Sequence, residues 1–320
     1  MSEYESNPTS TPCTQIEEKL IEYRYYLQNL RALAPTTIHY YCLIASQFLT
    51  RTDQHDGLGH LPQLTSQVIN DFICEVGKTV GRRTLLNVIT SIRSLLRFFT
   101  WHGEIPAGLD KQIDTPRVHR EEQLPRALAW ETVCALLESI DRSTPIGTRD
   151  YAMLLLIATY GLRASEVVSL KLDDINWKEN RLQIFQHKTA RQLLLPLTDD
   201  VGESIIKYLR QGRPVVPYRE IFVKHKGPDG ILKPINVTNV FNRWSQRSGL
   251  SIAFQGPHCL RHSYAVHLLR QGVALKTIGD ILGHSGFNST CVYLRLNIED
   301  LRTVPLNIPI HSPIIQGEKK

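Results

Sequence analysis

Six side chains in the second half of this 320-residue chain are of types that bind and attack phosphate: Arg163, Lys188, His258, Arg261, His284 and Tyr293. Two guanidinium groups, two imidazoles and an ammonium converge on one site only where that site holds concentrated negative charge. Paired arginines match the non-bridging oxygens of a phosphodiester. A tyrosine hydroxyl in such cationic surroundings is activated to attack phosphorus. The set predicts phosphoryl transfer, with Lys188 suited to protonate the leaving 5′-oxygen.

Each of these residues lies at the boundary of a predicted element, where a structural role is the ordinary explanation for it alone. Arg163 follows Gly161 at the end of an apolar helix, and His258 and Arg261 lie one turn apart at the start of another. His284 follows Gly283 at the end of the next helix. Only the convergence of all six side chains on one site indicates catalysis. The helices and the hairpin that carry them must therefore pack with their ends close together.

The elements predicted from hydrophobic periodicity are mainly helices. The first half has helical patterns over 16–30, 35–50, 65–76 and 82–100, which predict a small helical domain. The second half has helical patterns over 130–140, 149–160, 164–170, 199–210, 237–247, 258–271 and 275–282. Short apolar runs at 181–185 and 193–197 predict a β-hairpin with a basic tip, and 220–224 predicts another short strand.

Domain bounds follow from where these patterns stop. We expect a disordered leader at 1–15, an N-terminal domain at 16–105 and a linker at 106–125, where Pro106, Gly108, Pro116 and Pro125 interrupt a polar stretch. The second domain is expected at 126–302. The prolines of the 303–320 tail exclude a continued helix.

Positive charge is unevenly distributed along the chain. Residues 1–120 carry no net charge, so the whole formal excess of +6 lies in 121–320. Two basic stretches, 76–103 with no acidic residue and 204–247 with two, suggest phosphate-binding surfaces, although a solvated helix face would show the same pattern. The candidate DNA-contacting residues are Lys78, Arg82, Arg83, Arg93, Arg97, Arg191 and Arg243.

Several other classes of protein are excluded by missing motifs. The chain has no glycine-rich phosphate loop, no HExxH, no GxSxG and no paired Cys/His set with zinc spacing. His258 and His262, four residues apart on a helix, are a weaker candidate for a metal pair because no third ligand is evident. The six cysteines form no CxxC pair, and no apolar stretch is long enough for a membrane span, so we expect a cytoplasmic protein without metal or cofactor.

Four linked motifs resemble the tyrosine recombinase (phage integrase) family in order and spacing. They are Gly161-Leu162-Arg163-Ala164-Ser165-Glu166, Lys188 before Pro196, His258-Cys259-Leu260-Arg261-His262-Ser263-Tyr264-Ala265, and Leu282-Gly283-His284 followed by Tyr293. The resemblance implies a mainly α fold. It would combine a SAM-like core-binding domain with a mostly helical catalytic domain that holds a small antiparallel sheet, the DNA breaking-rejoining fold.

The same resemblance implies roles for individual residues. Arg163, Lys188, His258, Arg261 and His284 would be the catalytic set, Tyr293 the nucleophile that forms a 3′-phosphotyrosine, and Glu166 a support for Arg163. Family members act on double-stranded DNA sites as tetramers through a Holliday junction, without ATP or metal, and a monomer or weak dimer is expected without DNA. The tail at 303–320 is a candidate subunit contact.

Two alternatives stay open at this point. The first is a DNA-binding regulator that keeps the fold and has lost the chemistry, although intact Arg163, Lys188, Arg261 and Tyr293 argue against it. The second is a type IB topoisomerase-like enzyme, which relaxes DNA with similar residues and needs no second site.

Overall fold

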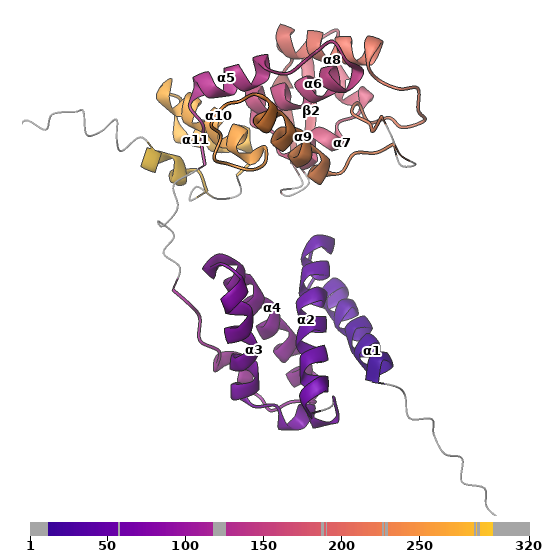
Figure 1. The fold of residues 1–320 in the computed structure, drawn as a ribbon, viewed down its shortest axis with the longest axis vertical. Helices are drawn as coiled ribbons and strands as arrows, with labels where there is room; N and C mark the ends of the chain where they lie inside the picture. Colours follow the sequence, from indigo (N-terminus) through magenta and orange to yellow (C-terminus); the bar gives the residue numbers. More distant parts are fainter. Residues whose placement is uncertain are drawn as a thin grey trace, which may run out of the picture. The chain divides into compact units, whose positions relative to one another are not determined.

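The computed structural model describes residues 12–56, 58–117, 126–186, 189, 191–225, 227, 230–284, 286 and 289–296. The chain divides into two compact units, Met1–Glu122 and Gln123–Lys320 (Figure 1). The division falls inside the predicted linker. Of the disordered leader expected at 1–15, only residues 12–15 are described, and they are helical; the tail at 303–320 lies outside the described residues.

The first unit is helical, as the sequence predicts. Its helices are α1 (Pro12–Tyr25), which continues as a π-helical turn over Tyr26–Leu30, α2 (Pro35–Asp56), α3 (Ser66–Thr79) and α4 (Arg82–Trp101). Val88, Ile92, Leu95 and Phe99 repeat at three- and four-residue spacing along α4 and are all buried. This stripe is the centre of the core, because α2 and α3 pack their own apolar faces against α4.

The first unit extends further along the chain than predicted. Ile105, Leu109 and Ile113 are buried in its core, so residues 106–113 of the predicted linker are part of the domain. A short 3₁₀ helix, Leu109–Lys111, carries this segment. The sequence did not predict this helix, because Pro106 and Gly108 interrupt the four-residue spacing of Ile105, Leu109 and Ile113. Helix α2 also extends beyond the predicted range of 35–50, to Asp56, and the 3₁₀ helix Leu58–Gln63 follows it.

The second unit is mostly helical with one small sheet, which confirms the predicted fold class. Its helices are α5 (Trp130–Glu138), α6 (Pro145–Tyr160), α7 (Ala164–Ser169), α8 (Asp199–Gln211), α9 (Pro234–Arg247), α10 (His258–Arg270), α11 (Leu275–Leu282) and the 3₁₀ helix η6 (Cys291–Leu296). Helix α6 is buried along almost its whole length and contacts α5, α7, α8, α9 and α10. Its carboxyl end leads directly to Arg163.

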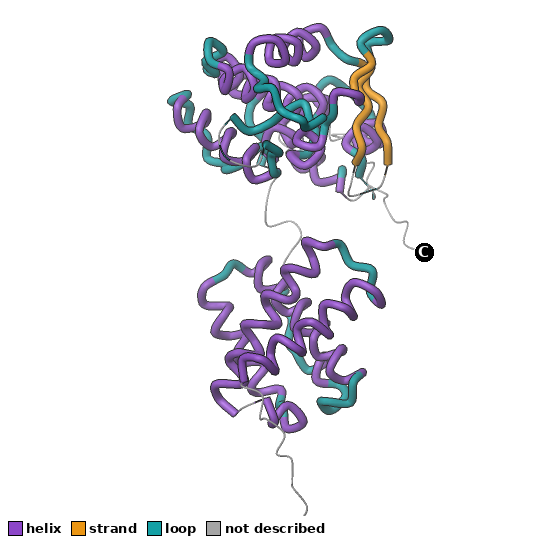
Figure 2. Tube along the Cα trace, turned by 90° about the vertical axis from the view of Figure 1, so that its right-hand side faces the viewer, coloured by secondary structure: helices purple, strands orange, loops and turns teal. Residues whose placement is uncertain are grey.

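The sheet is antiparallel, in the order β1 (Ile175–Asn176), β2 (Arg181–Gln186) and β3 (Arg191–Pro196), and lies at one side of the unit (Figure 2). Strand β2 alternates between exposed and buried residues, with Leu182, Ile184 and Gln186 facing inward. The β2–β3 hairpin confirms the prediction. The strand predicted at 220–224 is wrong, since this stretch makes only isolated bridges to Lys171 and Ile231.

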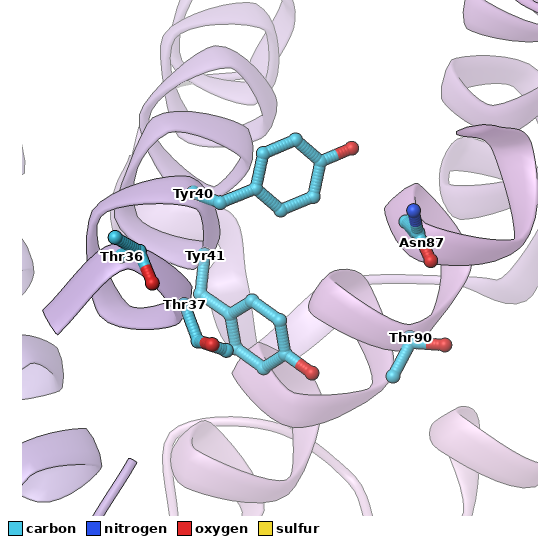
Figure 3. A pocket seen from close by; sticks show the side chains of 6 residues that line it. All are labelled: Thr36, Thr37, Tyr40, Tyr41, Asn87 and Thr90. Atoms are coloured by element: carbon cyan, nitrogen blue, oxygen red, sulfur yellow. The ribbon is translucent and has the colours of Figure 1, made fainter. Parts of the chain in front are cut away.

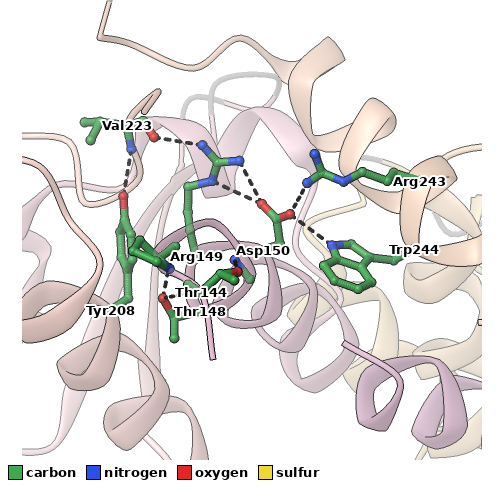
Figure 4. A network of polar contacts seen from close by, with 10 residues as sticks. Thr144, Thr148, Arg149, Asp150, Tyr208, Val223, Arg243 and Trp244 are labelled. Atoms are coloured by element: carbon green, nitrogen blue, oxygen red, sulfur yellow. Dashed lines mark hydrogen bonds and ion pairs between the residues drawn. The ribbon is translucent and has the colours of Figure 1, made fainter. Parts of the chain in front are cut away.

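A buried ionic network fixes the amino end of α6 (Figure 4). Asp150 is fully buried and accepts hydrogen bonds from Arg149 Nε at 3.1 Å, Arg149 Nη2 at 2.8 Å and Trp244 Nε1 at 2.9 Å. Arg243 of α9 also pairs with this carboxylate, and Arg149 Nη1 donates to the carbonyl of Val223. The network therefore ties α6 to α9 and to the 220–224 segment.

Candidate active site

Arg163 is positioned by the turn between α6 and α7. Helix α6 ends at Gly161, whose φ of 63° is the left-handed conformation that glycine adopts most easily. Glu166 accepts from the Arg163 backbone N–H at 2.8 Å and from Arg163 Nη1 at 2.7 Å, while Arg163 Nη2 donates to the carbonyl of Gly283 at 3.2 Å. The Glu166 side chain is 1 % exposed and that of Arg163 is 20 % exposed. Arg163 is thus fixed by Glu166 and Gly283, and its side chain remains accessible to solvent.

Arg261 lies in the first turn of α10 and is buried. Its Nη1 donates to the carbonyl of Gly161 and its Nη2 to that of Leu282, both at 2.5 Å. Burial, with a contribution from the nearby positive charge of Arg163, lowers the pKa of Arg261 to about 10. The group stays charged at neutral pH, so a second cation lies beside the first.

Two glycines allow these elements to meet. A Cβ on Gly161 would lie 2.7 Å from side-chain atoms of Leu282 and Tyr264, and a Cβ on Gly283, where φ is 60°, would lie 1.9 Å from Oε1 of Gln186. Gln186 ends β2 and is buried against Gly283. The β-hairpin therefore packs on the carboxyl end of α11. Lys188, two residues further on, lies outside the described residues.

Tyr293 lies in η6, which packs on α10, and only 1 % of its surface is exposed. Its hydroxyl is 3.1 Å from Nδ1 of His262, and its ring stacks on that of His284 at 6.3 Å between centroids. Nδ1 of His284 lies 2.8 Å from the hydroxyl of Thr290. Burial raises the pKa of Tyr293, and the positive charges of Arg261 and Arg163 partly offset that rise.

The structure brings Arg163, Glu166, Arg261, His284 and Tyr293 into one cluster of contacts. His258 joins it through His262, whose ring centroid is 4.5 Å away. In the sequence, His262 stands out only as half of a weak candidate metal pair, and its contact with Tyr293 is not predictable from the motifs. Its place one turn after His258 on α10 was the available signal.

The structure does not support a metal site at His258 and His262. Among the described residues, three potential metal-ligand atoms lie within 4.8 Å of one another only at Glu22, His102 and Glu104, so the group does not include His258 or His262. Thr290 and Gln186 were missed as well, because only the tertiary fold brings them to His284 and Gly283.

The basic residues predicted to contact DNA differ in their surroundings. Lys78, Arg82 and Arg83 are exposed at the end of α3 and the start of α4. In contrast, Arg93 donates to the carbonyls of Asp110 and Ile113, and Arg97 pairs with the Asp110 carboxylate. Both therefore hold the 105–115 segment on the domain. In the second unit, Arg191 is exposed at the start of β3, whereas Arg243 pairs with Asp150.

A pocket of about 360 Å³ opens between α2 and α4 of the first unit (Figure 3). Its lining residues are uncharged and each carries a hydroxyl or amide group: Thr36, Thr37, Tyr40 and Tyr41 from α2, and Asn87 and Thr90 from α4. The two tyrosine rings extend from α2 toward α4 (Figure 3). Hydroxyl and amide groups of this kind both donate and accept hydrogen bonds.

Comparison with known proteins matches both units to described families. Residues 126–300 match the phage integrase family, and residues 20–103 match the phage integrase N-terminal SAM-like domain. A putative integrase/recombinase y4rA of Sinorhizobium fredii is 35% identical over 96% of this chain and 73% of its own length. Tyrosine recombinase XerD of Listeria monocytogenes is 30% identical over 88% of this chain and 95% of its own.

The fold is shared with a solved structure, that of a lambda integrase tetramer bound to a Holliday junction. Its TM-score is 0.67, at 18% identity over 90% of this chain and 82% of that one. A helical SAM-like unit and a mostly helical unit that gathers two arginines, histidines and a tyrosine define the class of DNA strand-transfer enzymes. The chain belongs to the phage integrase family of tyrosine recombinases, which are site-specific DNA recombinases.

Proposed function

We propose that Tyr293 cuts and rejoins DNA at a specific site by forming a 3′-phosphotyrosine, and that strand exchange passes through a Holliday junction. The carrying observation is the placement of the Tyr293 hydroxyl in the cluster that holds Arg163 and Arg261, both anchored to carbonyl groups of their own chain. Anchored cations stabilise the charge that develops on a phosphoryl group in the transition state.

In the proposed step the Tyr293 oxygen bonds to phosphorus and the bond to the 5′-oxygen breaks. Each guanidinium has five N–H donors, and the contacts described above use two N–H-bearing nitrogens on each of Arg163 and Arg261. In this proposal, the remaining N–H groups of Arg163 and Arg261 donate to the phosphate oxygens. Lys188 protonates the leaving 5′-oxygen, and His258 and His284 complete the catalytic set. The phosphotyrosine keeps the energy of the broken bond for rejoining.

The first unit supplies sequence recognition in this proposal. The pocket between α2 and α4 presents hydroxyl and amide groups that suit base edges, and Arg82 and Arg83 on α4 suit backbone phosphates. Lys78 and, in the second unit, Arg191 add exposed positive charge. Arg93, Arg97 and Arg243 form hydrogen bonds or ion pairs within the protein, so we assign them a structural role.

The assembly that fits this function is a tetramer on two DNA sites. The similar lambda integrase forms a tetramer on a Holliday junction. We propose the same arrangement here, with a monomer or weak dimer before DNA binds, a tail at 303–320 that contacts a neighbouring subunit, and a cytoplasmic location. Within the described part of the chain, no helix has the length and apolar character to cross a membrane.

The test uses Tyr293→Phe and a DNA substrate with a nick that traps the covalent adduct. We expect the adduct to disappear while DNA affinity stays within a factor of about three. Tyr264→Phe, on α10 against Gly161, is the matched control and should retain the adduct. An adduct that persists in Tyr293→Phe would remove this residue as nucleophile.

The same assays separate the two alternatives. A regulator without chemistry would bind the site and form no adduct even in the natural sequence. A topoisomerase-like enzyme would relax plasmids that lack any recombination site, whereas a recombinase exchanges strands only between two matching sites.

A further inference from the structure

We propose that His262 is the base that removes the phenolic proton of Tyr293 when the tyrosine attacks phosphorus. This role rests on the proposed function, and it adds a catalytic residue to the set expected from the family motifs. The observation behind it is that Nδ1 of His262 lies 3.1 Å from the hydroxyl oxygen of Tyr293, which is the reacting atom.

Two packed elements, α10 and η6, fix the position of His262 relative to Tyr293. It follows Arg261 in the first two turns of α10, and Arg261 is anchored to the carbonyls of Gly161 and Leu282. On the other side η6 packs against α10 and buries Tyr293. The hydroxyl and the imidazole therefore meet through two packed elements, within the distance that general-base catalysis needs.

The surroundings make His262 a neutral imidazole. Burial, followed by the positive neighbours His258 and Arg261 on α10, His284 after α11 and Arg126 before α5, lowers the pKa of His262 to about 4. At neutral pH the ring carries no charge, so its unprotonated nitrogen is an acceptor. Because the pKa of Tyr293 is raised by burial, the phenol keeps its proton and donates it to Nδ1 in the tautomer with hydrogen on Nε2.

A bound phosphodiester strengthens this base. Its negative charge offsets the same positive neighbours that disfavour a charged imidazole, so the pKa of His262 rises when DNA occupies the site. The proton then passes from the Tyr293 oxygen to Nδ1 as the oxygen–phosphorus bond forms and the bond to the 5′-oxygen breaks. In the rejoining step the proton returns from His262 to the tyrosine oxygen. Base strength is thereby coupled to DNA binding.

The neighbouring histidines are placed for other tasks. Nδ1 of His284 lies 2.8 Å from the hydroxyl of Thr290, and its ring stacks on that of Tyr293. The ring of His258 lies against that of His262 at 72°. Both can bind phosphate oxygens while His262 handles the proton.

The experiment measures the rate of adduct formation on a nicked substrate between pH 6 and pH 10. His262→Ala should slow cleavage about 10²- to 10⁴-fold at pH 7, the usual contribution of a general base. Its rate should then rise about tenfold per pH unit, because hydroxide must ionise the tyrosine, whereas the natural protein levels off. A variant that cleaves with the natural pH profile would overturn the proposal.

His262→Asn separates proton transfer from positioning. Its amide oxygen replaces Nδ1 as hydrogen-bond acceptor but takes no proton, so the proposal expects it to be as slow as His262→Ala. A natural rate in His262→Asn would show that His262 only orients the hydroxyl. Free imidazole should restore part of the rate to His262→Ala, and this rescue keeps the test valid if the variant is less stable.

The matched control is His267→Ala, five residues along α10, where the imidazole stacks on Trp130 at 4.0 Å. It should leave the rate and its pH profile unchanged. The Tyr293→Phe result distinguishes the two levels of the argument. An adduct that depends on Tyr293 but not on His262 overturns only the inference about the base, whereas an adduct that does not need Tyr293 overturns the proposed function itself.

Discussion

Arg163 and Arg261 take their positions from partners within their own chain. Glu166 and the carbonyls of Gly161, Leu282 and Gly283 accept their N–H groups. These contacts hold both guanidinium groups in place through the protein itself. Fixed dipoles and charges of this kind cost no reorganisation when charge develops in the transition state, which is why they favour catalysis.

Replacing Glu166 with Gln should weaken both stability and cleavage. The change removes a buried carboxylate that accepts from the backbone and the side chain of Arg163. We expect a loss of about 1–3 kcal/mol in the free energy of unfolding, measured by urea denaturation, and slower adduct formation. Asp173→Asn is the control, because its pair with Arg219 is exposed and should contribute less than about 1 kcal/mol.

His262 should make the DNA-free protein sensitive to acid. Its pKa is about 4 in the folded state and near 6.5 when unfolded, so between these values the unfolded chain binds more protons. Stability therefore falls as the pH drops through this window. Thermal unfolding at pH 7 and pH 5 should show a larger decrease for the natural protein than for His262→Asn; equal decreases would contradict the assignment.

At the scale of elements, the ends of helices α6, α7, α10 and α11 pack together to form the site. The carboxyl ends of α6 and α11 supply the carbonyl groups, and the amino ends of α7 and α10 supply the arginines. Helix α6 is fixed at its other end by the Asp150 network (Figure 4). A buried helix held at both ends keeps the carbonyl of Gly161 in place for Arg261.

Gly161→Ala should disturb this meeting point. The substitution combines a strained positive φ with contacts of 2.7 Å to Leu282 and Tyr264, so we expect a destabilisation of about 2–4 kcal/mol and a strong loss of cleavage. Gly272→Ala is the matched control. Its φ is 81°, but a Cβ there meets nothing within 4 Å, so only about 1 kcal/mol should be lost and cleavage should persist.

At the scale of the whole molecule, positive charge is unevenly divided between the two units. The first unit has no excess of basic residues overall but places Arg82, Arg83 and Lys78 on its surface near one end of α4. The second unit carries the net positive charge of the chain, part of it in the catalytic cluster. In the function proposed above, the basic residues bind phosphates, and the uncharged groups of the pocket between α2 and α4 contact base edges.

The salt dependence of DNA binding tests the surface proposed for the first unit. Replacing both Arg82 and Arg83 with alanine should reduce the slope of log affinity against log salt by about two, one for each lost phosphate contact. Arg97→Ala should leave the slope unchanged, since its guanidinium pairs with Asp110. Asn87→Ala should instead reduce discrimination between specific and random DNA at an unchanged slope. Equal slopes for all three would refute the proposed surface.

Much of this protein follows from local pattern in the sequence. The stripe along α4, the apolar helix α6 and the β2–β3 hairpin were predictable because burial imposes a period of 3.6 or 2 on the chain. Linked motifs around Arg163, Arg261, His284 and Tyr293 predicted the family because their order and spacing resemble it, whereas the chemistry of phosphate accounts only for the residue types.

Other features depended on contacts between residues far apart in the chain. Ile105, Leu109 and Ile113 complete the first core although glycine and proline interrupt them. Arg93 and Arg97, expected to contact DNA, form hydrogen bonds with that segment. The pairing of His262 with Tyr293 was equally hidden, because no periodicity reports which side chain faces an element 31 residues away. Sequence by itself determined which residue types are available for catalysis; the packing of helix ends decided which of them touch.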